Sequence, residues 1–240
     1  LKKFPDVERF DVDETEEVQA TTFDTLYGHH IIKHLDFIKL DTQGSELPIL
    51  EGSQQTLNRG VCGIQVEVEF TEMYQGQSLF GEVDEFLRDH QFTLFDLIPV
   101  HWKRKKGSSL GGKRGQIIWG DALYLKSIDS MLTGLHGAEG HFRESKLVKL
   151  IFTTLLYGYT DYAMEIAHCE QVREHIDDEL LFVISRALGK PKSHYFKILN
   201  HVKGRNRFAE LFLRLSESIK NDRPGVYRDA RKLGNTWRNF

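Results

Sequence analysis

The chain has 240 residues, of which 40% are hydrophobic and 28% are charged, an ordinary globular composition with room for one large domain or one domain plus an appendage. Two cysteines, Cys62 and Cys169, exclude a disulfide framework and fit free thiols in a reducing compartment, so we expect a cytoplasmic location. The stretch that comes nearest to a membrane span starts at Leu147, but it is short and carries Lys149, so a core helix is expected there instead.

The net charge of -3 is unevenly distributed along the chain. Residues 1–91 hold 7 Lys/Arg against 19 Asp/Glu, whereas residues 189–240 hold 13 against 4. A basic end can meet nucleic acid, an anionic surface or the protein's own acidic part. A solvated face that needs no partner is the default interpretation, and we do not expect nucleic acid as a partner.

The first elements are predicted after an acidic segment near the start of the chain. A short strand is expected around residues 18–22, and Asp24 has the side chain of an N-cap for a helix over residues 25–34. The alternating apolar run LDFIKLD then predicts a buried strand that ends at Asp41.

Helices and strands are then expected to alternate. Ser45 is a good N-cap for a helix that Gly60 ends, and the β-prone run CGIQVEVEF follows. The run LFGEVDEFLRDH predicts a second helix from its apolar spacing. This alternation is typical of parallel strands joined by crossover helices.

The next pair of strands departs from that pattern. Residues 92–102 and 116–126 both predict strands, and the polar, glycine-rich loop between them indicates a hairpin that gives the sheet an antiparallel edge. Residues 107–113, GSSLGGK, match the start of a phosphate-binding loop, but Arg114 and Gly115 follow where Ser or Thr and a helix are needed. We therefore interpret this segment as a basic hairpin loop.

Only helices are predicted after Ser127. Apolar residues recur at helical spacing in four runs, followed by a basic stretch from Lys220. We expect two domains, a sheet domain over residues 1–130 and a helical extension with a basic tail over residues 131–240. The helical runs are HFRESKLVKLIFTTLLYGY, DYAMEIAHCEQVREHI, DELLFVISRAL and RFAELFLRLSESI.

Several of these segments together resemble the FkbM family of S-adenosylmethionine-dependent methyltransferases. DFIKLDTQGSELPILEGSQQTL resembles that family's strand ending in K-x-D and its G-x-E turn into a helix, and TTFDTL is similar to its T-x-L-D-x-L segment, with Phe23 in place of leucine. VEVEF, FGEVDEFL and GQIIWGDALYL stand where its later elements fall, so the resemblance covers about residues 15–127. It implies an α/β fold, the C-terminal half of a Rossmann-like class I methyltransferase sheet with an antiparallel final hairpin, followed by an all-α extension.

The candidate catalytic residues are Asp41, Glu46, Glu67 and Glu69. Asp41 closes its strand at the edge where open α/β sheets bind ligands, and Glu46 begins the next helix nearby. A carboxylate there can orient or deprotonate an acceptor hydroxyl. The alternative is that Asp41 only caps the turn and that Glu46 only satisfies the start of the helix.

Glu67 and Glu69 share one side of the neighbouring strand, which must meet water, a cation or a cleft because carboxylates are rarely buried without partners. Solvent exposure near the strand end is the competing interpretation. A magnesium ion bridging Asp41 and one of these glutamates is conceivable but not required, and no zinc spacing is present, so no metal is predicted.

The cofactor that the resemblance implies is S-adenosylmethionine, and its binding residues stay unknown. No strand with a glycine-rich turn precedes Asp24 and the first residue is Leu1 rather than Met, so we expect a fragment that does not bind the cofactor unaided. The expected function is O-methylation of a hydroxyl on a sugar, glycan or secondary metabolite, with a small-molecule or glycan acceptor. The alternative is a non-catalytic binding module whose helical region docks a protein or polyanion.

Overall fold

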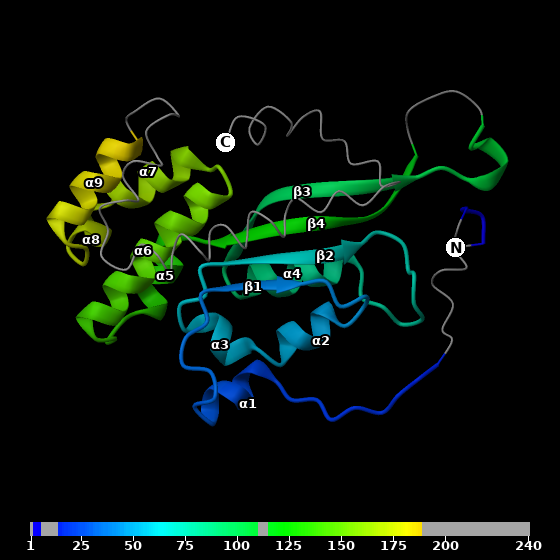
Figure 1. Ribbon diagram of the computed structural model, residues 1–240, viewed down its shortest axis with the longest axis horizontal. Coiled ribbons are helices and arrows are strands. Elements are labelled where there is room, and N and C mark those ends of the chain that lie inside the picture. Colours follow the sequence, from blue (N-terminus) through cyan, green and yellow to red (C-terminus); the bar gives the residue numbers. More distant parts are fainter. Residues whose placement is uncertain (1, 6–13, 110–114, 189–240) are drawn as a thin grey trace. The chain divides into compact units, whose positions relative to one another are not determined.

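The computed structural model describes residues 2–5, 14–109 and 115–188 of the chain (Figure 1). The described residues divide into two compact units, one up to Ala138 and the other from Glu139 to Leu188. The first unit carries the sheet. In the second unit, the described residues form helices only.

The first unit follows the predicted alternation of helices and strands. Its elements are α1 (Phe23–Gly28), β1 (Phe37–Leu40), α2 (Glu46–Glu51), α3 (Gln54–Asn58), β2 (Gly63–Glu69), α4 (Phe80–Asp89), β3 (Phe92–Trp102), the short 3₁₀ helix η2 (Lys105–Gly107), β4 (Gln116–Lys126) and α5 (Ile128–Gly134). These elements and their sheet confirm the predicted α/β class, consistent with a partial Rossmann-like methyltransferase fold.

The four strands form one sheet in the order β1-β2-β4-β3. β1 and β2 are parallel, and β4 pairs antiparallel with both β2 and β3, as the hairpin predicted. The antiparallel strand is not at the edge, however. β4 is inserted between β2 and β3, so β3 is the outermost strand and runs in the same direction as β2.

The main core of this unit lies on one face of the sheet. Ile64, Val66 and Val68 alternate along β2 toward that core, where they meet Val83 and Leu87 of α4. Figure 1 shows α4 behind the sheet, on the side away from the viewer. The intervening residues of β2 therefore lie on the opposite face.

The start of the chain differs from its prediction in two respects. Residues 14–22 contain no strand, so the strand expected around residues 18–22 was wrong. Asp24 is not the N-cap of α1 either, because the Thr22 side chain accepts from the Thr25 N–H at 3.1 Å. Asp24 lies in the first turn, and α1 ends at Gly28 rather than near residue 34.

Asp24 caps a different helix. Its carboxylate accepts hydrogen bonds from the backbone N–H of Gln55 at 2.9 Å and of Thr56 at 2.8 Å, and from the Thr56 hydroxyl at 2.6 Å. These groups belong to the first turn of α3, whose N–H groups have no partner within the helix. Asp24 therefore joins α1 to α3.

The helix expected from Ser45 to Gly60 is broken into α2 and α3. The chain turns at Gly52 and Ser53, and the Ser53 hydroxyl donates to the Ile49 carbonyl. A Cβ atom at Gly52 would lie 2.8 Å from Cγ2 of Thr22, so glycine allows the segment before α1 to approach closely. This tertiary contact is not visible in the helical periodicity.

β3 is an irregular strand. Its pairing with β4 shifts between Leu94 and Asp96 and again between Val100 and His101. Pro99 lies between these two irregularities and has no N–H to donate. Such bulges bend a strand and interrupt its ladder.

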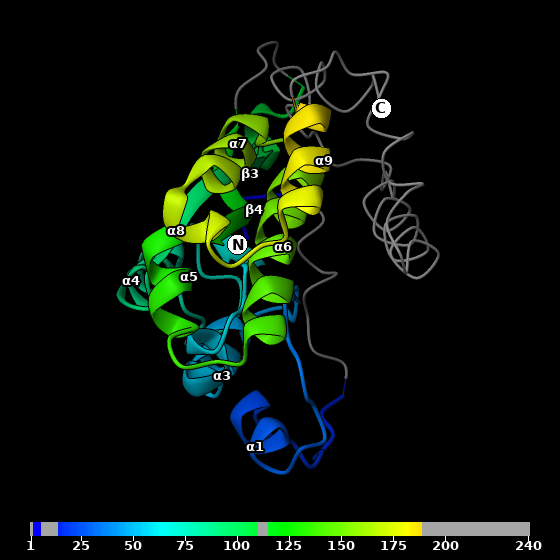
Figure 2. The ribbon, with the colours of Figure 1, turned by 90° about the vertical axis from the view of Figure 1, so that its left-hand side faces the viewer.

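The second unit contains α6 (Gly140–Leu156), α7 (Thr160–His168), α8 (Glu170–Arg173) and α9 (Asp178–Leu188) (Figure 2). α7 contacts α6, α8 and α9, with Ala163 and Ile166 buried. The single helix expected over residues 161–176 is interrupted at Cys169, whose backbone leaves the helical region. The helix expected over residues 207–219 and the basic tail lie outside the described residues.

Candidate functional site

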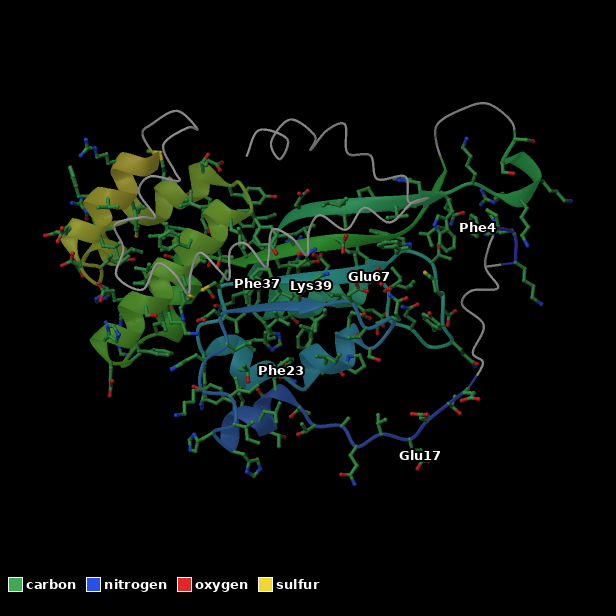
Figure 3. All side chains as sticks on the ribbon, in the orientation of Figure 1. Phe4, Glu17, Phe23, Phe37, Lys39 and Glu67 are labelled. Carbon is green, nitrogen blue, oxygen red and sulfur yellow. The ribbon has the colours of Figure 1, made fainter. Side chains whose placement is uncertain are left out.

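The candidate residues lie where β1 and β2 end. Asp41 directly follows β1, and Glu67 and Glu69 lie near the carboxyl end of β2. Because these strands are parallel, their carboxyl ends meet at the same edge of the sheet. Figure 3 shows Glu67 together with Phe37 and Lys39 of β1 on the face turned away from the core.

The turn after β1 is held by Glu46. Its buried carboxylate accepts from the Thr42 N–H at 2.6 Å, from the Thr42 hydroxyl at 2.9 Å and from the Gly44 N–H at 2.9 Å. Gly44 has a φ of 115°, which favours glycine, and a Cβ there would lie 3.2 Å from Nε2 of Gln77. Glu46 thus fixes a tight turn rather than pointing freely into the site.

Gln43 connects the two strand ends. It adopts a left-handed conformation with φ of 59°, and its Nε2 donates to Asp41 Oδ1 at 3.0 Å and to Glu67 Oε2 at 2.8 Å. One amide group therefore holds an exposed carboxyl and a buried carboxyl together. Gln43 was not among the residues predicted for the site.

Glu67 is buried among other acids. Only 8% of it is exposed, and burial, together with the charges of Asp41, Glu69 and Asp121, raises its pKa to about 8. Asp121 of β4 lies directly opposite Glu67 in the sheet register. Glu67 is therefore mostly protonated at neutral pH.

Glu69 has a similar environment. It is 3% exposed, and burial and the charge of Glu46 raise its pKa to about 7, although Gln77 acts in the lowering direction. Gln77 is itself buried, and its Oε1 accepts from the Met73 and Tyr74 N–H groups. Its Nε2 makes no hydrogen bond to another described residue, so the amide lies near Glu69 without full hydrogen-bond geometry.

The structure thus brings all four predicted residues to one sheet edge, but in different environments. Asp41 is exposed, whereas Glu46, Glu67 and Glu69 are buried, so the solvent exposure considered for Glu67 and Glu69 was wrong. Gln43, Gln77 and Asp121 complete the cluster and were not predicted. The strand alternation could have indicated Asp121, but only with the register of β4 known.

The cluster combines the exposed carboxyl of Asp41 with two buried carboxyls whose raised pKa values favour the protonated form, that of Glu67 more than that of Glu69. Protonated carboxyls donate hydrogen bonds, and an ionised one accepts them. No group of three or more His, Cys, Asp or Glu side chains in the described part of the chain is arranged to hold a metal ion. Among the same residues, no helix is long and apolar enough to cross a membrane.

Comparison with protein families gives a match to the methyltransferase FkbM domain over residues 3–94. The FkbM resemblance is confirmed. The match includes β1, β2, the turn between Asp41 and Glu46, and the start of β3, and it supports a methyltransferase in general. It begins earlier and ends earlier than the resemblance over residues 15–127. No curated protein and no solved structure matches the chain.

Proposed function

We propose that the FkbM domain belongs to an S-adenosylmethionine-dependent methyltransferase that methylates a hydroxyl oxygen on a sugar, a glycan or a secondary metabolite. The observation that carries this proposal is the Gln43 bridge between Asp41 and Glu67 at the carboxyl ends of two parallel strands. Ligands of open α/β sheets bind at this edge. An exposed acceptor and a buried, protonated donor held side by side suit a reaction at a hydroxyl group.

The described residues fit the cofactor in part. S-adenosylmethionine would supply the methyl group from a positively charged sulfonium, and the exposed carboxylate of Asp41 offers complementary negative charge. Among residues 2–5 and 14–36, no strand with a glycine-rich turn is present to hold its nucleotide and amino-acid parts. We therefore assign the acceptor side of the site to these residues and leave its cofactor-binding residues unassigned.

Each residue of the cluster has a distinct proposed task. Asp41 orients the acceptor hydroxyl and takes its proton, because it is the exposed carboxyl of the bridged pair. Glu67 keeps its proton and donates a hydrogen bond toward the acceptor, and Gln43 fixes the spacing between the two carboxyls. Glu46 positions the turn, and Glu69 borders the site next to Gln77.

The test is Asp41→Asn in the protein that carries this chain. Transfer of labelled methyl from S-adenosylmethionine is measured on the hydroxylated acceptor that the wild type uses best among sugars, glycans and small metabolites. We expect a loss of at least about tenfold, because positioned bases contribute about 10²–10⁴-fold. The fold should survive the nearly isosteric change.

The matched control is Asp89→Asn, at an exposed position at the end of α4. This control should keep wild-type turnover. Unchanged turnover in Asp41→Asn, with both variants folded, would leave Asp41 as a turn residue and contradict its proposed role.

A non-catalytic binding module is the second candidate. The observation that favours it is the exposure of two large apolar side chains in the second unit, Phe182 at 63% and Met164 at 38%. Exposed apolar side chains mark a protein-docking site where they form one contiguous patch. Calorimetry on the protein that carries this chain separates the candidates, because saturable binding of S-adenosylmethionine supports the enzyme, whereas a protein that captures a partner but never binds the cofactor supports the module.

A further inference from the structure

The segment that joins β3 to β4 is strongly basic. Residues 97–120 contain six Lys or Arg residues and no Asp or Glu. Lys103 to Lys106 follow β3 directly, and Arg104, Lys105 and Lys106 are exposed. Lys2 and Lys3, near the start of the chain, are also exposed. We call Lys2, Lys3, Arg104, Lys105 and Lys106 the basic cluster.

Phe4 assembles this cluster. Its fully buried ring packs edge-on against Trp102, with ring centroids 5.8 Å apart and an angle of 70° between the planes. Lys3 Nζ lies 5.5 Å and Arg104 Cζ 5.8 Å from the centre of the Phe4 ring, and the Lys105 N–H donates to the Lys3 carbonyl at 2.9 Å. Two cations on one aromatic ring are held close together despite their repulsion. Figure 3 shows Phe4 beside the end of the β3–β4 hairpin.

Hydrogen bonds connect the basic cluster to the edge that carries the carboxyls. Arg104 Nη2 donates to Gln116 Oε1 at 2.6 Å, and Gln116 Nε2 donates to the Thr71 hydroxyl at 3.3 Å, just beyond β2. Trp119 pairs with Glu69 in the sheet, and Gln116 precedes it on β4. At the usual rise of about 3.3 Å per residue, Gln116 is about 17 Å along the strand from Asp121, the position opposite Glu67.

Among the residues that the structure describes, no carboxylate forms an ion pair with any of the five members of the basic cluster. The carboxyl cluster offers hydrogen-bond partners for a hydroxyl, so an anionic group and a hydroxyl of one molecule would be drawn to different ends of this edge.

The surroundings of the cluster disfavour two other anionic partners. Single-stranded nucleic acid is bound by aromatic rings on which bases stack, and membranes are bound by exposed apolar side chains. Phe4 is fully buried, and the exposed large apolar residues of the described chain all lie elsewhere. They are Val18, Ile31, Met164 and Phe182.

We propose that the basic cluster binds an anionic group of the methyl acceptor, and that the acceptor is an anionic oligosaccharide with a sulfate, phosphate or carboxylate about 17 Å from the reacting hydroxyl. This inference rests on the proposed function, since it names the acceptor class of the same site. The basic cluster supplies charge and fixed geometry, and the carboxyls of Asp41 and Glu67 receive the hydroxyl.

The first experiment is a calorimetric titration of the 240-residue protein with a sulfated hexasaccharide, without cofactor. The variant Arg104→Gln/Lys105→Gln/Lys106→Gln should bind at least about tenfold more weakly, the sum expected for three exposed charge contacts. The control Lys33→Gln/Arg173→Gln/Arg186→Gln removes the same charge from exposed positions elsewhere and should lose less than about threefold. Equal losses in the two triple variants, or no loss in either, overturn the proposal.

The same variants are titrated with a single-stranded oligonucleotide of equal charge and with vesicles that contain anionic lipid. A loss confined to the hexasaccharide supports the proposal. A larger cluster-dependent loss with the oligonucleotide or the vesicles overturns it in favour of that partner.

The second experiment uses the protein that carries this chain and compares labelled-methyl transfer to a hexasaccharide of galacturonate and to a neutral hexasaccharide. The proposal is supported if the wild type prefers the anionic hexasaccharide and the cluster variant loses this preference through a higher KM. Equal transfer to the anionic and the neutral hexasaccharide overturns it. If no saccharide is methylated while cluster-dependent binding persists, the proposed function fails and the anion site stands. The two failures are therefore distinguishable.

Discussion

Glu67 and Asp121 lie opposite each other on neighbouring strands, an arrangement in which two negative charges destabilise a sheet. The Gln43 amide can donate to Glu67 but cannot neutralise it. Burial, together with the charges of Asp41, Glu69 and Asp121, raises the pKa of Glu67. The protonation of this residue is therefore part of the stability of the fold as well as of its proposed chemistry.

We predict that the stability of the first unit falls with rising pH because of Glu67. Its pKa rises from 4.5 to about 8 on folding, so its contribution is complete below 4.5 and is lost as the pH passes through about 8. Glu69, with a pKa of about 7, acts in the same direction. Glu67→Gln should flatten this fall and stabilise the protein at pH 9 by about 1–3 kcal/mol, the typical cost of an uncompensated buried polar group.

The measurement is urea unfolding at pH 5, 7 and 9, followed by tryptophan fluorescence. Glu85→Gln, at an exposed position of α4, is the control and should keep the wild-type dependence on pH. An identical slope in wild type and Glu67→Gln would mean that Glu67 is ionised in the folded protein throughout this range.

At the scale of elements, the hydrogen bonds of Asp24 to α3 join two segments far apart in sequence. We predict that Asp24→Ala lowers the free energy of unfolding by about 0.5–2 kcal/mol, the usual effect of losing a helix cap. Asp24→Asn keeps an acceptor oxygen and should lose less. Burial raises the pKa of Asp24, but the bonds from Thr56 and Gln55 outweigh it and the pKa is lowered.

Because the folded-state pKa of Asp24 is lowered, its contribution is present above the ordinary value of 3.8 and is lost as the pH falls through the folded-state pKa. Denaturant unfolding at pH 7 and near pH 3 should therefore show the difference between wild type and Asp24→Ala shrinking in acid. A difference that grows in acid would contradict the capping role.

The elements with a strong pattern could be predicted from sequence. β2, α4 and both strands of the hairpin follow from apolar alternation and helical spacing, which are properties of neighbouring residues. The break between α2 and α3 could not, because it depends on the approach of Thr22 to Gly52. Asp24 was assigned to the wrong helix for the same reason, since a capping side chain does not reveal which helix it reaches.

The site was predictable to a similar extent. The position of Asp41 after an apolar strand and the alternation of Glu67 and Glu69 were enough to place them at one edge. Their burial was not, because it depends on side chains that arrive from other segments. Gln77 comes from an irregular loop, and Asp121 requires the register of β4, which no local pattern determines.

At the scale of the whole molecule, each unit has buried apolar residues of its own. Leu57 belongs to the core of the first unit and Leu150 to that of the second, and both are fully buried. We predict two thermal transitions in calorimetry. Leu57→Ala should lower the midpoint temperature of one transition and Leu150→Ala that of the other, each by an amount equivalent to about 2–5 kcal/mol. A single transition that moves equally in both variants would contradict independent units.

The irregular course of β3 has a consequence for how the molecule meets its own copies. A row of evenly spaced donors and acceptors on an outermost strand is a template on which another chain can add a strand. In β3 the missing N–H of Pro99 and the two register shifts on either side interrupt that row. The outer side of β3 is therefore a poor start for the intermolecular sheets from which aggregates grow.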